Sequence, residues 1–406
     1  VLSAVAGLEL PIVVLPVLPR TSGGAREAWP HRNLGGSGGE RLRKMSGGDT
    51  SAEPLPQTGS WLSALSSWWS GTSREWRSES QFRLLSARSK QEAEIKLVGR
   101  PGCRLCTIDF QGPAGSEHLS PVVLIHGFGM GSGLWARQFD QISKHRRVIA
   151  IDLPGMGCSE CPRFEGSTPK DAEDYFISAI TEWQKSMGIP HMVLVGHAFG
   201  AYLAAVYTLR RPKHVTQLLL SSPAGIEKYS KYKDYADTHM LLSLLWRMHV
   251  TPQSIVRAVG LWLGARIVRA ICAARFMGED LSAIAQVSEY VYHLWVLSSD
   301  AERAYRALIM VGGFGRAPLC DRLHRLRSPA TFIFGEHDWK SHTPADNILP
   351  RLPVPAKVVL IANAGHHVYL DNSEHFNALV CRTLNHAQEG RAASTHPPTV
   401  YCPTPI

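Results

Sequence analysis

Residues 192–200, MVLVGHAFG, join a short apolar run to a helix-favouring run, Ala201–Leu209, through two closely spaced glycines. The pattern Gly196-x-x-x-Gly200 at a strand–helix junction is typical of the G-x-S-x-G turn, which displays a catalytic serine at the end of a sheet. The glycines of such a turn are needed because side chains have no room beside the central residue. The central residue here is Ala198, so the chain keeps the pattern of the turn without its nucleophile.

Strand-like apolar runs alternate with helical stretches on both sides of this turn, from about Gly102 onward. Such alternation predicts a mostly parallel sheet with helices on both faces. Residues 226–315 interrupt the alternation with helical patterns rich in apolar and basic residues, which we interpret as a cap over a site. The fold class is therefore α/β, with flanking helices and a helical cap insertion. The predicted strands are Val122–Ile125, Val148–Ile151, Met192–Val195, Gln217–Leu220, Thr331–Phe334 and Lys357–Ile361.

Composition divides the chain into four segments. Residues 1–58 are rich in Gly, Pro, Ser and Arg without a sustained period, which predicts a disordered or non-native leader. The first methionine is Met45, and we expect residues 1–44 to be upstream translation or a fragment artefact. Residues 59–92 are a tryptophan-rich amphipathic segment, 93–385 form the α/β domain, and the proline-rich residues 386–406 are predicted to be a disordered tail.

Charge and composition limit the classes of partner. The net charge of +9 favours acidic partners such as phospholipid headgroups or phosphate-bearing substrates. No basic run interleaved with aromatic residues indicates nucleic acid, and no apolar run reaches the roughly 18 residues of a membrane-spanning helix. The pairs Cys103/Cys106 and Cys158/Cys161 have a zinc-like spacing, but no histidine completes either knuckle. We therefore predict reduced cysteines, no metal site and no resident cofactor.

A second glycine-rich segment, His126-Gly-Phe-Gly129, follows the strand Val122–Ile125. Folds with a G-x-S-x-G turn place one N–H of their oxyanion hole there. We predict that the N–H groups of Phe128 and Phe199 would bind a developing oxyanion. A glycine-rich turn without a ligand is the alternative. The segment Asp152–Ser159, after the next strand, is interpreted as a structural turn beside the site.

An acid and a histidine follow in the order that such a site requires. Asp338 comes just after the strand Thr331–Phe334 and is the predicted acid, with Glu336 as a nearby competitor. His366 follows the last predicted strand and is the predicted histidine, because the glycine before it favours it over His367.

His366 and Asp371 also form an H-x-x-x-x-D pattern, which some acyltransferases use to activate a hydroxyl for acyl transfer. Two alternatives compete with this interpretation. His366 already has its place beside the predicted acid, and Asp371 can cap the following helix, Asn372–Leu384.

These residues together resemble the four/five subfamily of α/β-hydrolase-domain proteins. Trp135 and the stretch Val287–His293 (VSEYVYH) add to the resemblance, which runs from about Ser60 to Leu384 and includes the cap. It implies an α/β-hydrolase fold for residues 93–385. One branch of the subfamily keeps the serine and acts as a lysophospholipase on N-acyl phosphatidylethanolamines. The other lacks it, sits on lipid droplets through its tryptophans and activates adipose triglyceride lipase; lysophosphatidic acid acyl transfer has also been attributed to the family.

Ala198 puts the chain, by analogy, on the non-hydrolytic side. That branch has asparagine at this position, and Phe199 and Ala201 replace the family's usual leucine and glycine. The alanine is therefore either an independent loss or an engineered replacement in an active enzyme.

A methyl group cannot attack a carbonyl, and losing the serine costs on the order of 10⁶ in turnover. The pocket can still bind an acyl ester or acyl-CoA, because binding uses its walls and donors.

The resemblance implies a lipid-surface regulator in the cytoplasm, bound peripherally to lipid droplets or the endoplasmic reticulum membrane. Its implied partners are a triglyceride lipase and droplet-coat proteins. The alternative is an enzyme, either a lysophosphatidic acid acyltransferase or a lysophospholipase and N-acyl phosphatidylethanolamine hydrolase whose serine has been replaced. Ala198 favours the regulator, whereas the intact Asp338 and His366 favour the enzyme, because a long-inactive site would tend to lose them.

Tryptophans near the start of the domain predict reversible attachment to a lipid surface, since the ring is apolar and its N–H stays near water. Packing on the domain itself is the alternative. In the cap, Trp262, Leu263 and Phe276 lie among four arginines, and this group either continues the lipid-facing surface or is solvated. The arginines are Arg257, Arg266, Arg269 and Arg275. Arg316, before the turn at Pro318, is expected to contact a protein partner, as its position in the family implies. The tryptophans that predict attachment to a lipid surface are Trp61, Trp68, Trp69 and Trp76.

Overall fold

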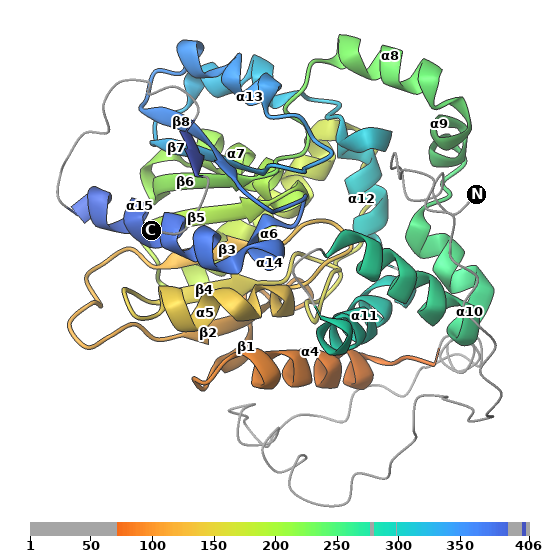
Figure 1. Ribbon diagram of the computed structural model, residues 1–406, viewed down its shortest axis with the longest axis horizontal. Helices are drawn as coiled ribbons and strands as arrows, with labels where there is room; N and C mark the ends of the chain where they lie inside the picture. Colours follow the sequence, from red (N-terminus) through yellow and green to blue (C-terminus); the bar gives the residue numbers. More distant parts are fainter. Residues whose placement is uncertain (1–70, 277–279, 298, 389–399, 403–406) are drawn as a thin grey trace, which may run out of the picture.

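The structure is a computed structural model that describes residues 71–276, 280–297, 299–388 and 400–402 (Figure 1). The predicted leader, residues 1–58, lies outside the described residues, as do Trp61, Trp68 and Trp69. The described residues include the whole predicted α/β domain, 93–385, apart from residues 277–279 and 298.

A nine-stranded sheet forms the centre of the molecule, in the order β1-β2-β4-β3-β5-β6-β7-β8-β9 (Figure 1). Strand β2 is antiparallel to both of its neighbours, and all other pairs are parallel. The six predicted strands are all present, and the mostly parallel sheet is confirmed. The strands are β1 Glu94–Val98, β2 Leu105–Phe110, β3 Val122–Ile125, β4 Val148–Ile151, β5 Met192–His197, β6 Val215–Ser221, β7 Ala330–Gly335, β8 Ala356–Ile361 and β9 Val400–Cys402.

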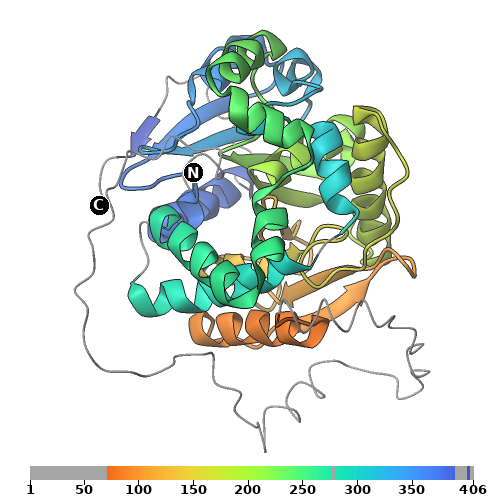
Figure 2. The ribbon, with the colours of Figure 1, turned by 90° about the vertical axis from the view of Figure 1, so that its right-hand side faces the viewer.

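Successive residues of the buried strands face two different cores, because side chains alternate across a strand. In β3, Val123 and Ile125 join the core formed with α6, α7 and α12, whereas Val122 and Leu124 join the core formed with α4, α5 and α15. Helices therefore cover both faces of the sheet (Figures 1 and 2). The helices outside the cap are α4 Arg74–Arg88, α5 Ala136–Ile142, α6 Pro169–Ser186, α7 Phe199–Arg210, α13 Thr343–Asp346, α14 Val368–Asp371 and α15 Ser373–Gln388.

The predicted cap lies between β6 and β7, and its regular elements among the described residues are helices, as the pattern predicted. Helix α10 begins with a capping box between Thr251 and Ser254 and has a proline at its first position. It is kinked at Gly260, whose φ is +74°. Figure 2 views the molecule from the side on which the cap lies. The helices are α8 Tyr229–Thr238, α9 Met240–Arg247, α10 Pro252–Arg275, α11 Leu281–Val296 and α12 Ala301–Leu308.

Helix α4 carries the described end of the tryptophan-rich segment and packs on the domain along α11 (Figure 1). The Thr72 hydroxyl and His293 Nδ1 are 2.7 Å apart, which ties the residues before α4 to α11. Trp76 lies on the outer side of α4 and is 42% exposed. Within the described residues, this part of the segment is thus a packed helix that still presents one tryptophan to solvent.

The predicted disordered tail is wrong at Val400–Cys402, which pair with β8 as the ninth strand. The strand has only three residues and lies among prolines, so nothing in its local pattern indicates a strand. Val400–Cys402 form a strand because they pair with the otherwise free edge of β8. Residues 389–399 and 403–406 of the predicted tail lie outside the described residues.

Candidate functional site

Strand β5 and helix α7 meet in a sharp turn at Ala198, whose positive φ of +48° is rare for a residue with a Cβ. The Ala198 N–H donates to the Ser221 carbonyl oxygen in β6 at 2.9 Å. A Cβ on Gly196 would lie 2.5 Å from the Gly200 carbonyl oxygen. A Cβ on Gly200 would collide with the carbonyl oxygens of Ile125 and His126. The close packing of α7 on β3 and β5 therefore requires both glycines, which explains the spacing seen in the sequence.

Asp338 and His366 lie in the loops after β7 and β8, and their side chains meet. His366 Nδ1 is 3.0 Å from Asp338 Oδ1, and the Lys340 backbone N–H donates to the same oxygen at 2.9 Å. Burial acts to raise the pKa of Asp338, but the charge and hydrogen bond of His366 outweigh it and hold this pKa below its ordinary value. An anionic Asp338 therefore orients the imidazole through Nδ1, and His366 lines the same pocket as Ala198.

Neither competitor identified in the sequence replaces this pair. Glu336 accepts the Asn363 backbone N–H at 3.2 Å, so its carboxylate contacts the turn after β8. The His367 ring is buried between His197 and Phe276, at centroid distances of 5.0 and 4.8 Å. Burial holds the pKa of His367 well below that of free histidine, so this ring is neutral. The acid and histidine that meet are the ones the sequence analysis preferred.

Asp371 lies at the end of α14 and turns back toward the loop that carries His366. Its Oδ2 accepts the Gly365 backbone N–H at 2.9 Å. The alternative interpretation, that Asp371 caps the next helix, is wrong, because the His375 N–H is bonded at 3.3 Å to the Asn372 side chain. Asp371 thus supports the conformation of the His366 loop.

The predicted oxyanion donors, Phe128 and Phe199, belong to two segments that meet at Ala198. A Cβ on Gly127 would be 3.3 Å from the Ala198 Cβ, so the segment before Phe128 packs directly against the turn. Within the described chain, neither the Phe128 N–H nor the Phe199 N–H has a hydrogen-bond partner. Their rings are held by Tyr305 of α12, which stacks on Phe128 at 3.7 Å and meets Phe199 edge-on at 4.8 Å.

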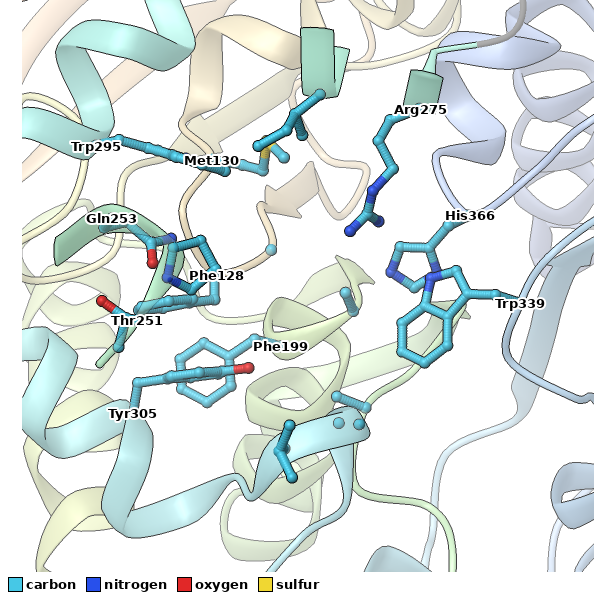
Figure 3. Close-up of a pocket in the computed structure, with 18 of the residues that line it drawn as sticks. Phe128, Met130, Phe199, Thr251, Gln253, Arg275, Trp295, Tyr305, Trp339 and His366 are labelled. Atoms are coloured by element: carbon cyan, nitrogen blue, oxygen red, sulfur yellow. The ribbon is translucent and has the colours of Figure 1, made fainter. Parts of the chain in front are cut away.

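A pocket of about 220 Å³ extends from Ala198 into the cap (Figure 3). Its floor is the turn and the Gly127–Phe128 segment, and its walls come largely from apolar residues of α9 to α12. The volume and the apolar walls of the pocket fit a ligand that has an apolar chain in the cap and a polar end at Ala198. The apolar and aromatic lining residues are Phe128, Met130, Phe199, Leu242, Leu245, Trp246, Val250, Ile255, Ile271, Phe276, Val291, Trp295, Tyr305, Met310, Val311 and Trp339.

Two basic side chains, Arg275 and Lys340, also line the pocket, and no carboxylate is among those of its lining residues that the structure describes. The Arg275 guanidinium points toward the side of the pocket where His366 lies (Figure 3). Burial lowers the pKa of Arg275 to about 10 and also lowers that of Lys340, while Asp338 acts in the opposite direction on both. Arg275 therefore stays charged at neutral pH.

The sequence analysis did not identify three of these groups as parts of the site. Arg275 and Phe276 were interpreted as membrane-facing or solvated, which is wrong, because both line the pocket. His197 was treated only as a spacer of the turn, but its Nε2 lies 3.0 Å from the His366 carbonyl oxygen and holds that loop. Burial lowers the pKa of His197 to about 3, so the ring is neutral and its Nε2–H donates. No local signal distinguishes Arg275 from the other cap arginines.

The remaining predicted residues lie away from the pocket. Arg316 is exposed, and its Nε donates to the Arg306 carbonyl oxygen at 3.2 Å, so its predicted partner contact stays a prediction. The two C-x-x-C pairs do not combine into one cluster. Cys106 and Cys158 instead approach Asp152, whose carboxylate accepts the Ser132 and Cys158 N–H groups at 2.6 and 2.8 Å. Asp152 thus braces the turn that the sequence analysis interpreted as structural.

The strand order, the turn at Ala198 and the loops after β7 and β8 define an α/β-hydrolase fold. The model of the α/β hydrolase fold family matches residues 120–373, and the chain belongs to that family. Three relatives place it more closely, in the four/five subfamily of α/β-hydrolase-domain proteins. A 1-acylglycerol-3-phosphate O-acyltransferase of Mus musculus, ABHD5, is 34% identical over 70% of this chain and 83% of its own length.

The other two relatives carry different activities in their names. The (lyso)-N-acylphosphatidylethanolamine lipase of Bos taurus is 32% identical over 64% of this chain and 78% of its own. The probable 1-acylglycerol-3-phosphate O-acyltransferase of Oryza sativa subsp. japonica is 33% identical over 65% of this chain and 67% of its own. Among solved structures, carboxylesterase CesB from Bacillus subtilis is similar with a TM-score of 0.56 and 19% identity, over 77% of this chain and 98% of its own. This likeness shows the fold alone.

Proposed function

We propose that the protein binds an acyl ester of a lipid at a lipid surface without hydrolysing it, and that this binding regulates a triglyceride lipase. The observation that carries the proposal is the methyl group of Ala198 at a turn whose surroundings are otherwise equipped to bind an ester. The Asp338–His366 pair, the unbonded N–H groups of Phe128 and Phe199 and an apolar pocket are all present. The subfamily resemblance supplies the lipase and droplet-coat partners, and the cytoplasmic face of lipid droplets or of the endoplasmic reticulum as the location.

The two sides of α9 support contact with a lipid surface. Leu242, Leu245 and Trp246 line the pocket, whereas the opposite arc of the helix is apolar and exposed. A helix with apolar residues on both sides suits a water–lipid interface, because water would otherwise face the outer arc. No described helix is long and apolar enough to cross a membrane. The exposed apolar residues are Met240, Leu241 and Leu244 of α9 and Met248 directly after it, and Arg247 is exposed beside them.

The variant Ala198→Ser tests whether the pocket is a hydrolase site that lacks only its nucleophile. We expect no turnover of lysophospholipid or N-acyl phosphatidylethanolamine by the unaltered protein, and turnover raised by roughly 10³-fold or more in the variant. Ala198→Ser combined with His366→Ala is the control and should lose the gain. Turnover by the unaltered protein would contradict the non-hydrolytic proposal. Failure of both proteins to bind or cleave these lipids would contradict the acyl-ester pocket.

Acyl transfer is the second candidate, favoured by the retained Asp338–His366 pair and by the acyltransferase activity that the names of two relatives give. In such a step His366 would take the proton of a lysophosphatidic acid hydroxyl, whose oxygen attacks the thioester carbonyl of acyl-CoA. The C–O bond forms, the C–S bond breaks and the thiolate receives the proton, so no enzyme nucleophile is needed. Transfer of a labelled acyl group by the unaltered protein, lost in His366→Gln, would establish this activity.

A further inference from the structure

Arg275 is the last residue of α10, and its side chain extends into the pocket from the cap (Figure 3). Its Nε is buried without a hydrogen-bond partner, and in the described chain the guanidinium forms no hydrogen bond or ion pair. Arg275 as a whole is partly buried, and a cation that loses part of its hydration without gaining a protein partner is unfavourable. Such a residue in a pocket indicates an anion that arrives with the ligand.

Other partly buried arginines of this protein show what Arg275 lacks. Arg257, on the same helix, donates to both carboxylate oxygens of Glu302 at 2.7 and 2.9 Å. Arg147 makes a similar two-pronged contact with Asp109 at 2.9 and 2.6 Å. Arg275 has the same planar fork of N–H donors, but in the described part of the chain no carboxylate lines the pocket to bind it.

Lys340 adds a second positive charge to the same pocket. It is 6% exposed, and its Nζ lies 3.5 Å from the Gly312 carbonyl oxygen and 5.2 Å from the centroid of the Trp339 ring. Asp338 acts on the pKa of both Lys340 and Arg275, so both cations lie within electrostatic range of the Asp338–His366 pair. Two cations therefore lie near His366, and the anionic groups that act on them are Glu227 and Asp338 for Lys340 and Asp338 for Arg275.

We propose that Arg275, assisted by Lys340, binds a phosphate group of the ligand whose acyl ester lies at Ala198. The inference rests on the proposed acyl-ester function, whose ligands carry phosphate, and adds the residues that bind that phosphate. A phosphate oxygen pair matches the fork of Arg275, and the apolar walls take the acyl chain. The phosphate belongs either to the headgroup of a lysophospholipid or to acyl-CoA, since both place phosphate and acyl group in one molecule.

Binding of soluble ligands by the full chain tests this assignment, with thermal stabilisation and calorimetry as readouts. The probes are 1-oleoylglycerol-3-phosphate, 1-oleoylglycerol and oleoyl-CoA, each kept below its micelle concentration. Because a charged hydrogen bond to phosphate is removed, Arg275→Gln should weaken the affinity for a phosphate-bearing probe about ten-fold or more. Its affinity for 1-oleoylglycerol should not change. The matched control is Arg269→Gln, which replaces an exposed arginine of the same helix.

The affinities of Arg275→Gln for the three probes, compared with those of the unaltered protein, distinguish the possible outcomes. Loss confined to oleoylglycerol phosphate identifies the lipid headgroup as the source of the phosphate, and loss confined to oleoyl-CoA identifies the acyl donor. If Arg275→Gln binds all probes as the unaltered protein does, the phosphate assignment is wrong while the acyl pocket stands. If the unaltered protein binds none of them, the proposed function itself fails.

Stability of the variant gives an independent readout. Because Arg275 has no polar partner in the described chain, Arg275→Gln without ligand should melt at an unchanged or higher temperature. A clear decrease would show that the side chain serves the fold, and would contradict the proposal. Arg275→Lys, which keeps the charge but not the fork, should retain part of the preference for the phosphate probes.

Discussion

Ala198 shows that the shape of a catalytic turn and its chemistry are separable at the level of single residues. The positive φ at Ala198 is imposed by Gly196 and Gly200, which let α7 pack against β3 and β5. The backbone therefore holds the geometry for a nucleophile even though the side chain is a methyl group. Around it, His197 fixes the His366 loop through the His366 carbonyl oxygen, which does not depend on the residue at position 198.

Gly200→Ala is expected to destabilise the fold by about 3 kcal/mol or more, because its Cβ would collide with backbone carbonyl oxygens that cannot move separately. Gly102→Ala is the control. Gly102 has a positive φ of +82°, unlike Gly200, and no atom lies within 4 Å of its added Cβ. That change should cost only about 1 kcal/mol of backbone strain. Urea unfolding measures both, and equal losses would contradict the packing explanation of the turn.

At the level of elements, α4 and α11 are coupled through a buried histidine. His293 of α11 faces the Thr72 hydroxyl just before α4, and Arg77 and Arg83 of α4 lie close enough to affect its charge. Burial first, and then these two arginines, lower the pKa of His293 to about 4. The contact therefore depends on a neutral imidazole, so acid should loosen the attachment of α4.

The sign of this effect follows from proton binding. Between pH 6.5 and about 4 the unfolded chain protonates His293 and the folded chain does not, so stability falls as pH falls, by about 1.4 kcal/mol per unit. Above pH 6.5 His293 is neutral in both the folded and the unfolded chain, so it does not lower the free energy of unfolding there. His293→Gln should therefore reduce the loss of unfolding free energy between pH 7 and 5 by about 2 kcal/mol. His145→Gln, at an exposed histidine, should leave the loss as it is. Identical pH dependence of the three proteins in urea unfolding would contradict this.

At the level of the whole molecule, the cap contributes both the walls of the pocket and an exposed apolar surface. The outer arc of α9, with Met240 and Leu244, is exposed, and Trp262 after the kink of α10 is 71% exposed. The Arg266 guanidinium lies 3.7 Å from the centroid of the Trp262 ring. The net charge of +9 adds attraction to anionic lipid. A membrane contact at this surface would bring the pocket close to its lipid ligand.

Met240→Ser together with Leu244→Ser should weaken binding to vesicles of phosphatidylcholine and phosphatidylserine about ten-fold or more, because two apolar side chains no longer leave water on binding. Co-sedimentation measures the bound fraction. Leu97→Ser is the control, since Leu97 is 44% exposed, close to the 53% of Leu244, but lies on β1. Unchanged vesicle binding of the double variant would show that the cap is not the lipid-facing surface.

Local patterns were sufficient for six central strands, the cap and the positions of Ala198, Asp338 and His366. Apolar runs identified these strands, helical patterns identified the cap, and the glycine spacing around Ala198 located the turn. Asp338 and His366 were identifiable because parallel strands bring the loops after β7 and β8 to the same edge of the sheet. These features depend on neighbours in sequence or on a topology that the strand pattern already implies.

Long-range contacts decided the rest. β9 exists through its pairing with the edge of β8, and Asp371 holds Gly365 instead of capping a helix. Arg275 looks like any other arginine of an amphipathic helix until the cap folds over the turn and buries it in the pocket. The partial burial of Arg275 and its lack of a partner in the described chain depend on residues that are distant in sequence. No periodicity within α10 encodes them, and they become visible only when α10 is packed over Ala198.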